Sequence, residues 1–444
     1  MVGSTSTGSE AMDKTGVAII GMGTVGTGVA RLLLDHGDRT ARHAGRTLWL
    51  EHVVVRDVAR PRQVDLPSGV LTDRLEDVLD NPRVAVVAQL IGGLEPARSI
   101  MLRLLEAGKD IVTANKALLA EHGPELFDRA RELGRTIAFE GAVAGGIPIV
   151  TNIGQCLSAN QIISLQGILN GTSNFIVSSM EESGTSFDAA LRAAQEAGYA
   201  EADPTWDVDG TDAAQKLAIL AHLAFGARLQ WTDIPRVGID QLQPDDLRFA
   251  SELGYRVKLL AVARLQSAGL ELNVSPTLVR RGRPLAEVRG AHNAVSVVGD
   301  AVGRVFFHGL GAGQMPTASA VVADLIDTAV GRTRITFRNL ELWSQREART
   351  DLRARRELPG RYYLRWSVRD EPGVMAQIAG VLGEHRISIA SLIQHEPAGG
   401  RDASLVPLVI MTHETTEGAV DDAASAIDRL DAVHPPGVRM RVLD

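Results

Sequence analysis

The chain of 444 residues is 45% hydrophobic and 23% charged, a composition typical of a globular protein with enough length for two or three domains. Its formal net charge of −8 argues against nucleic acid or an anionic membrane as the main partner, and no apolar run reaches transmembrane length. The single cysteine, Cys156, excludes an intramolecular disulfide, and we expect a buried structural thiol in a reducing, cytoplasmic setting.

Strand and helix patterns alternate through residues 15–141. Residues 1–14 before them are polar and lack the features of a signal peptide, so we expect a disordered tail. The predicted strands are VAIIG, LEHVVVRD, VAVVAQLIG and KDIVTAN, and the predicted helices include GMGTVGTGVARLLLDH and SIMLRLLEAG. This alternation predicts an α/β fold that begins with a Rossmann-like, doubly wound parallel sheet.

The sequence changes character twice beyond this first domain. Near residue 142 the glycine-rich GAVAGGIPIV indicates a transition to a second domain, 142–313, with mixed strands and long helices. Residues 341–360 are charged and weakly apolar, which is typical of a linker. From 361 to 444 the patterns follow the order βαββαβ, which predicts a small ferredoxin-like domain.

A glycine-rich turn follows the first predicted strand and opens a helix. It reads Gly21, Met22, Gly23, Thr24, Val25 and Gly26. The first glycine permits the tight turn, the second lets a pyrophosphate approach the backbone, and the third lets the helix pack on the strand. In this setting the motif predicts dinucleotide binding.

The end of the second predicted strand discriminates between nicotinamide cofactors. A carboxylate there selects the ribose 2′-hydroxyl of NAD, whereas an arginine can meet the 2′-phosphate of NADP. Arg56 occupies this place and Asp57 follows it directly. We therefore favour NADP(H) as the cofactor and leave NAD(H) open as the alternative. The same pattern also fits an Arg56 that is a solvated residue at the strand end with no role in binding.

An acidic stretch from Gly198 to Lys216 runs straight into the apolar segment LAILAHLAF. Its carboxylates are Glu201, Asp203, Asp207, Asp209 and Asp212. Asp212 and Lys216 are four residues apart and share one face of a helix, for which Asp209 is the expected N-cap. A capped helix with a surface ion pair is the simplest interpretation of this stretch alone.

With these residues in view, the chain resembles homoserine dehydrogenases of the long form, which end in an ACT domain. The motifs that carry the resemblance are GMGTVG, LIGGLEPA, VTANKALLA, GAVAGGIPIV, NGTSNFI, the acidic stretch, GLGAGQMPTASAVVAD and VPLVIMTH. The resemblance covers almost everything after the tail. It implies a catalytic and dimerisation domain at 142–313, an ACT domain at 361–444, and NAD(P)-dependent interconversion of L-homoserine and L-aspartate 4-semialdehyde.

The resemblance also implies roles for individual residues. Lys216 is the expected proton carrier, supported by Asp212, and Lys116 is its rival beside the nicotinamide and the substrate. Glu201 and Asp212 match the acids that bind the substrate ammonium, with Asp207 a weaker candidate. Hydride transfer to or from an alcohol carbon needs such a positioned acid or base.

Further cofactor contacts are implied near Gly92, at Lys116, and at Gly313, whose following helix, within about 314–340, is expected to rejoin the first domain. The loop FEGAVAGGIP resembles a structural sodium site built mostly from backbone carbonyls. The matching positions are Glu140, Val143, Gly145 and Ile147. A glycine turn that only joins two domains is the alternative.

The ACT resemblance implies a small amino-acid effector, L-threonine, and a homo-oligomer, a dimer or a tetramer. Asp370 to Val374 form the expected strand-to-helix turn. Arg386 stands where ACT helices usually end in glycine or asparagine, and positive φ there would cost about 1 kcal/mol. A dimerisation module without a ligand is the alternative.

Two other functions compete with this interpretation. Aspartate-semialdehyde dehydrogenase chemistry needs a nucleophilic cysteine in its own motif, which Cys156 in GQCLSAN lacks. A catalytically silent NADP(H)-binding amino-acid sensor with an ACT module is the second, and the presence of Glu201, Asp212, Lys116 and Lys216 argues against it.

Overall fold

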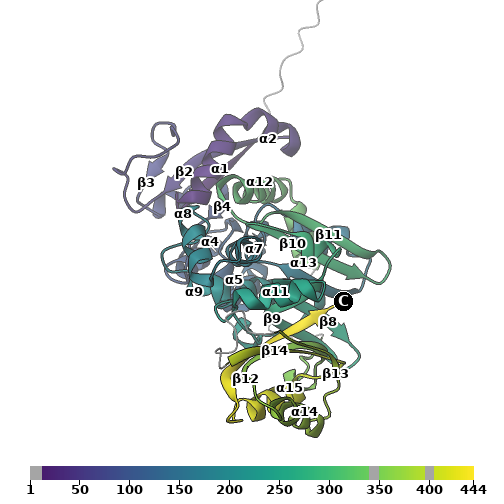
Figure 1. Ribbon diagram of the computed structural model, residues 1–444. Coiled ribbons are helices and arrows are strands. Elements are labelled where there is room, and N and C mark those ends of the chain that lie inside the picture. The colour runs from purple at the N-terminus through teal and green to yellow at the C-terminus, as the bar shows by residue number, and fades with distance from the viewer. Residues whose placement is uncertain (1–12, 340–349, 396–404) are drawn as a thin grey trace, which may run out of the picture. The chain divides into compact units, whose positions relative to one another are not determined.

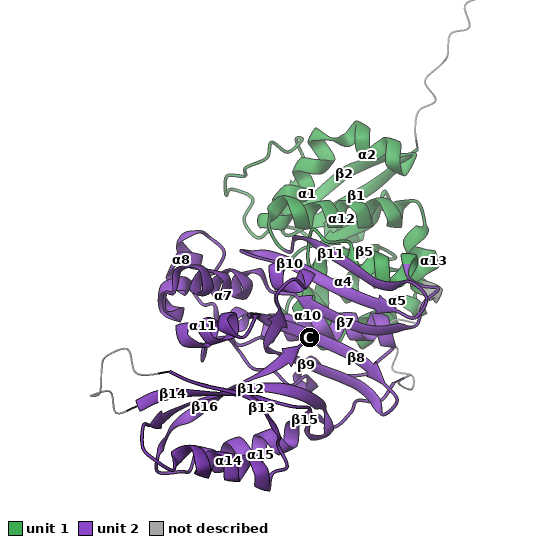
Figure 2. Ribbon diagram, turned by 45° about the vertical axis from the view of Figure 1, so that its right-hand side comes forward, with its two compact units in different colours: residues 1–156, 312–347 green, residues 157–311, 348–444 purple. Residues whose placement is uncertain are grey.

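A computed structural model describes residues 13–339, 350–395 and 405–444 (Figure 1). Unit 1 comprises residues 1–156 and 312–347, and unit 2 comprises residues 157–311 and 348–444 (Figure 2). The predicted tail lies outside the described residues except for its last two, and the predicted linker lies outside them up to residue 349.

The described part of unit 1 contains a parallel sheet with the strand order β3-β2-β1-β4-β5-β6. The strands are β1 (Lys14–Ile20), β2 (Thr47–Val54), β3 (Leu71–Thr72), β4 (Val84–Gln89), β5 (Asp110–Thr113) and β6 (Ile137–Ala138). This is the order of a Rossmann sheet, as the alternation predicted. Six of the seven residues of β1 are buried, because a parallel strand is covered on both faces.

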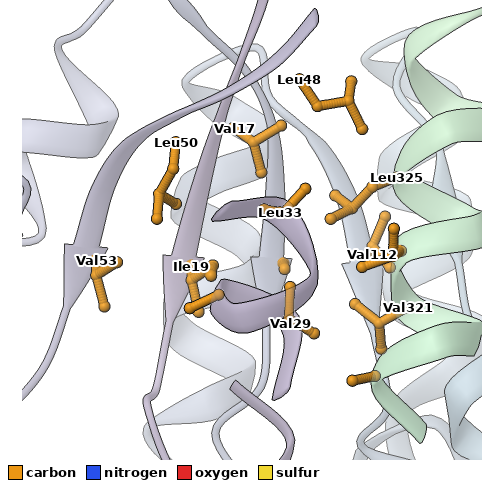
Figure 3. Packing of buried hydrophobic residues seen from close by; sticks show 14 of the residues in the cluster. Val17, Ile19, Val29, Leu33, Leu48, Leu50, Val53, Val112, Val321 and Leu325 are labelled. Carbon is orange, nitrogen blue, oxygen red and sulfur yellow. The ribbon is translucent and has the colours of Figure 1, made fainter. Parts of the chain in front are cut away.

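The described part of unit 1 also contains helices, several of which pack on this sheet. They are α1 (Thr24–Asp35), α2 (Gly37–Ala44), α3 (Glu76–Leu79), α4 (Ala97–Glu106), α5 (Lys116–Glu132), α6 (Ile149–Thr151), α12 (Gln314–Ala329) and α13 (Arg332–Asn339). Helix α12 lies beside α1, and Val321 and Leu325 enter the same core as Val17 and Val29 (Figure 3). A segment almost 300 residues downstream thus completes the first core.

Unit 2 is built on one long mixed sheet with the order β11-β10-β7-β8-β9-β16-β12-β14-β13. The strands are β7 (Ile162–Ile168), β8 (Tyr255–Gln266), β9 (Gly269–Arg280), β10 (His292–Gly299), β11 (Gly303–Leu310), β12 (Pro359–Arg369), β13 (Ile389–Gln394), β14 (Leu405–Thr412), β15 (Thr415–Thr416), which pairs with β12, and β16 (Val433–Leu443). The helices are α7 (Gly171–Ser183), α8 (Phe187–Glu196), α9 (Thr205–Val208), α10 (Thr211–Phe225), α11 (Pro244–Glu252), α14 (Val374–Glu384) and α15 (Glu417–Ile427).

Apart from the two-residue strand β15, the last segment of the chain has the predicted βαββαβ order, β12-α14-β13-β14-α15-β16. Its helices α14 and α15 lie on one side of its strands (Figure 2), and a core that includes Trp366, Ile378 and Ile427 fills the space between them. Arg386 follows α14 with φ of 58°, so the left-handed residue expected at this helix end is an arginine.

The sequence indicated a separate C-terminal domain, but its sheet continues that of the middle segment. Strand β16 pairs in parallel with β9 over Thr277–Val279. The same edge of β9 also pairs with Arg236 at Val274 and with Leu352 at Leu270. A buried ion pair reinforces this attachment, because Arg365 of β12 donates to both carboxylate oxygens of Asp246 in α11 (2.6 and 3.1 Å).

Candidate active site

The helix that carries Lys216 and Asp212 is buried along most of its length. It begins after Gly210, whose φ of 85° is left-handed and whose backbone approaches Val274 closely. The expected N-cap was wrong by one residue, because Gly210 caps α10. Asp209 instead accepts hydrogen bonds from the amide and hydroxyl of Thr211 (2.8 and 2.9 Å) and so orders the turn.

The Lys216–Asp212 pair is buried, so the simplest interpretation of a surface ion pair does not hold. Lys216 Nζ donates to Asp212 Oδ2 and to the carbonyl oxygen of Leu169, both at 2.7 Å. Lys216 is 8% exposed and Asp212 3% exposed. Buried charges persist only when paired and hydrogen-bonded, so this ammonium is held in a fixed place.

Asn170 joins two of the predicted carboxylates. Its side-chain nitrogen donates to Asp207 Oδ1 (2.7 Å) and to Asp212 Oδ2 (2.9 Å), while its oxygen accepts from the amide of Ser173 and caps α7. Asn170 opens the NGTSNFI motif, and the sequence predicted no role for it. An asparagine between a buried strand and a helix was the signal that could have found it.

A second asparagine, Asn293, acts on the same site. It donates to the carbonyl of Leu169 (3.0 Å), which also accepts from Lys216. Gly311 must be glycine here, because a Cβ on it would overlap the Asn293 side chain. These contacts fix the carbonyl to which Lys216 is anchored.

Glu201 lies outside this network. Its side chain is exposed, and among the described residues no hydrogen bond or ion pair engages its carboxylate. The structure therefore brings together Asp207, Asp212 and Lys216, and leaves Glu201 apart from them.

The glycine-rich turn of unit 1 has the geometry that a dinucleotide site needs. Gly21 has φ of 95°, and a Cβ on Gly26 would overlap the carbonyl oxygen of Gly21, whereas Gly23 faces open space. Gly23 is the N-cap of α1, which starts at Thr24 and has no acidic residue in its first turn. The amides at this helix start are thus suited to a pyrophosphate, and Val25 packs partly against the core.

The predicted residues on the neighbouring strand ends are ordered by another asparagine. Asn115 caps α5, which starts at Lys116, and donates to the carbonyls of Ile91 (2.9 Å) and Gly93 (2.7 Å). Lys116 is half-buried and Gly92 is exposed, with open space beside its Cα. Asn115 therefore fixes the turn around Gly92 relative to the start of α5.

Arg56 and Asp57 follow β2 and are both exposed. The Asp57 carboxylate accepts from the amide of Ala59 (2.9 Å), which engages it in a local turn. Among the described residues nothing forms an ion pair or a hydrogen bond with the Arg56 side chain. The Arg56 side chain is therefore available to a ligand, whereas one oxygen of Asp57 is engaged locally.

The helix α12 begins after Gly313, which has φ of 119°. Helix α1 approaches it closely, because a Cβ on Gly28 would lie 2.8 Å from Ala318 Cβ. Gly313 therefore stands at a helix start in unit 1, the unit that holds the glycine-rich turn.

In the candidate cation loop, residues 140–147, the only charged side chain is that of Glu140, and it is engaged by other groups of the protein. The Glu140 carboxylate accepts from the amides of Val150 (2.9 Å) and Thr151 (2.8 Å). The carbonyls of Val143 and Gly145 are in buried residues, and within the described chain they accept no hydrogen bond. Ala144 between them has φ of 52°.

The Ile147 carbonyl accepts from the amide of Ile149 (2.7 Å) and keeps a second lone pair. No group of three or more His, Cys, Asp or Glu in the described ranges could hold a metal. Orphaned buried carbonyls are the donors that a hard monovalent cation takes, so this loop fits such an ion.

Two further expectations concern the cysteine and membrane-spanning segments. Cys156 is exposed, so the buried structural thiol was wrong. It lies at the end of the short helical turn Asn152–Cys156, whose buried residues are Ile153 and Gly154. Across the described residues, no helix is long and apolar enough to span a bilayer.

Comparison with protein families assigns most of the chain. Residues 21–140 match the model "Homoserine dehydrogenase, NAD binding domain", residues 148–326 match "Homoserine dehydrogenase", and residues 362–432 match "ACT domain". The protein is therefore a nicotinamide-dependent oxidoreductase with an ACT domain.

Individual relatives agree over nearly the full length. The homoserine dehydrogenase of Pseudomonas aeruginosa is 45% identical over 97% of this chain and 99% of its own, and that of Bacillus subtilis is 39% identical over 94% and 95%. A solved homoserine dehydrogenase from Thiobacillus denitrificans matches with a TM-score of 0.89 at 42% identity, covering 98% and 99%. The chain belongs to the homoserine dehydrogenase family, and nothing in these matches supports a silent sensor.

Proposed function

We propose that the protein interconverts L-homoserine and L-aspartate 4-semialdehyde with NADP(H), and that Lys216 carries the proton. The observation that carries this proposal is the buried network in which Asp212 and the Leu169 carbonyl hold the Lys216 ammonium. When bound, the nicotinamide supplies or accepts the hydride. We assign the enzyme to the biosynthesis of aspartate-derived amino acids, such as threonine, methionine and isoleucine, because its proposed substrate and product are themselves amino acids.

Lys216 acts as a general acid in the reductive direction. Its ammonium gives a proton to the oxygen that becomes the alcohol, and in the oxidative direction the neutral amine takes the proton back. Asp212 stabilises the charged form of Lys216 and keeps its side chain in place. Lys116, at the start of α5 in unit 1, is the second candidate for this proton.

The substrate ammonium requires carboxylates. Asp207 and Asp212 are held side by side through Asn170, which supports their role as acceptors for that ammonium. Glu201 is a further candidate for binding the substrate ammonium. Its side chain is exposed, and this role is supported by the family resemblance alone.

For the cofactor we propose NADP(H) over NAD(H). Gly21, Gly23, Thr24, Val25 and Gly26 would cradle the pyrophosphate, with further contacts from Gly92, Lys116 and Gly313. The exposed Arg56 guanidinium supports recognition of a 2′-phosphate. A solved archaeal homoserine dehydrogenase, 25% identical to this chain with a TM-score of 0.59, is described as a complex with NADPH.

We further propose that Na⁺ binds this loop, mostly through backbone carbonyls, at Glu140, Val143, Gly145 and Ile147. The ACT domain is proposed to bind L-threonine as a feedback effector, and the chain to form a homo-oligomer, a dimer or a tetramer. We also assign it to the cytoplasm.

The test follows NADPH absorbance with L-aspartate 4-semialdehyde in the wild type and in Lys216→Ala, Lys116→Ala and Arg56→Ser. We expect Lys216→Ala to lower kcat by about 10²- to 10⁴-fold, the usual contribution of a general acid, with KM for NADPH unchanged. Arg56→Ser should raise KM for NADPH and not for NADH. No wild-type turnover would refute the function, and full activity in Lys216→Ala would transfer the proton to Lys116.

A further inference from the structure

A charged cleft in unit 2 has no part in the proposed chemistry. It lies where β16 and α15 meet β9, with an empty volume of about 500 Å³ that includes its opening to solvent. Four arginines and two carboxylates line it: Arg236, Arg355, Arg439, Arg441, Glu417 and Asp421. A ligand can use only the charges that are not already neutralised within the protein.

Three of the arginines are paired within the cleft. Glu417 accepts from Arg355 (2.8 Å) and from Arg441, and Asp421 pairs with Arg439. These carboxylates lie in the first two turns of α15 and hold the arginines in fixed positions. The cleft thus already shows a geometry in which guanidinium groups bind carboxylates.

Arg236 is the exception. It is exposed, its guanidinium stacks over Trp231 at 5.3 Å, and within the described residues it has no carboxylate partner. Even when the buried Glu271 behind Arg441 is counted, four positive groups face three negative ones. The cleft therefore has an excess of one positive charge.

Tyr362 provides a second, independent indication of a ligand. It lines the cleft and is 3% exposed, and its hydroxyl has no hydrogen-bond partner in the described structure. A buried polar group without a partner is uncommon and destabilising, and it calls for an explanation. Burial raises the pKa of Tyr362, so its hydroxyl keeps its proton and can donate it in a hydrogen bond.

We propose that this cleft binds a small carboxylate with a short apolar body. Arg236 would pair with the carboxylate, Tyr362 would donate to it after a small adjustment of the lining, and Val237, Val420 and Met440 would contact the body. This site is separate from the turn Asp370–Val374 at the start of α14. None of those residues lines the cleft.

The cleft is also connected to the turn that precedes the catalytic helix. The Val237 amide donates to the carbonyl of Val274 (2.9 Å), and the Ile239 amide donates to the carbonyl of Val208 (2.8 Å). A Cβ on Gly210, the N-cap of α10, would lie 3.2 Å from Val274 and 3.7 Å from the Val237 carbonyl. A ligand that fixes Arg236 and Val237 thus acts on the segment that supports the start of α10, and we infer that occupancy changes turnover.

The binding test is a ligand-observed NMR titration of the full-length protein with butanoate, succinate and inorganic phosphate, without substrate or cofactor. The variants are Arg236→Gln and Tyr362→Phe, with Arg192→Gln on α8 as the control for a lost surface charge. We expect a dissociation constant on the order of 1 mM for butanoate, weakened about tenfold by Arg236→Gln and about threefold by Tyr362→Phe. Because the Tyr362 hydroxyl has no partner, its removal should leave the fold intact.

Several results would overturn the site. These are the absence of saturable binding in the wild type, binding unchanged in Arg236→Gln and Tyr362→Phe, or tighter binding of phosphate than of the carboxylates. The transmission step rests on the proposed function and uses its NADPH assay. Saturating butanoate should change wild-type turnover at least twofold and leave Arg236→Gln unaffected, and an unchanged wild-type rate refutes that step. Binding is measured without turnover, so failure of the site and failure of the enzymatic function are distinguishable.

Discussion

Arg365→Met tests how the C-terminal segment is attached within unit 2. Arg365 is 5% exposed and Asp246 is completely buried, and two hydrogen bonds join them. Removing one partner of a buried pair costs about 3–5 kcal/mol, because the other charge stays buried. Tyr363 (3.1 Å) and the Gln243 amide (2.9 Å) still donate to Asp246, so we expect the lower end, about 3 kcal/mol.

The assay is amide hydrogen exchange of β12 and β16, which reports local opening without a two-state assumption for the whole chain. A loss of about 3 kcal/mol corresponds to exchange roughly 150-fold faster in these strands. Arg369→Met on the same strand is the matched control, because Arg369 is exposed and, among the described residues, its guanidinium donates only to the Asp431 carbonyl. Its expected cost is under about 1 kcal/mol.

The double variant Asp246→Leu with Arg365→Met should recover part of the loss, because no charge then stays buried. Recovery is incomplete, since the Tyr363 hydroxyl loses its acceptor. Equal exchange in Arg365→Met and Arg369→Met would refute the reasoning, and so would a double variant less stable than either single one.

Three further predictions concern separate elements. Gly26→Ala should abolish NADPH binding and lower stability by about 1–3 kcal/mol, because its Cβ overlaps the Gly21 carbonyl, whereas Gly23→Ala should weaken binding with an unchanged melting temperature. Arg386→Gly should stabilise by up to about 1 kcal/mol in urea unfolding, because φ is 58° there, and a loss of stability would contradict the strain. Burial lowers the pKa of His222 to about 4, so the unfolded state binds more protons than the folded state between pH 6.5 and pH 4. The free energy of unfolding should therefore fall by at most about 3 kcal/mol as the pH drops across this range. His222→Gln should reduce this pH dependence in unfolding measured from pH 6.5 to pH 4.

The sequence predicted what depends on local pattern. Each of these features is encoded within a few consecutive residues: the buried strand β1, the turn at Gly21, and the i,i+4 pair of Asp212 and Lys216. The resemblance extended this to the helix near residue 314, whose place beside α1 no local pattern encodes.

Long-range contacts were not predictable in the same way. Asn170 reaches Asp212 across 42 positions and Asn293 reaches Leu169 across 124, and a single sequence carries no signal of such pairings. The capping error at Asp209 has a local cause, since Gly210 in the left-handed region starts the helix one residue later. Continuity of β16 with β9 was missed because parallel pairing joins strands of any sequence separation.

The outer edge of β9 has a consequence for modularity. Three unrelated segments cover it, at Leu270, at Val274 and at Thr277–Val279. A chain shortened before β12 would keep α10 but lose the β16 cover, leaving a strand with free amides and carbonyls beside buried apolar side chains. Such an edge recruits other chains and promotes aggregation. The C-terminal segment therefore cannot be removed as an independent domain. A shortened form would need another segment to cover the exposed edge of β9.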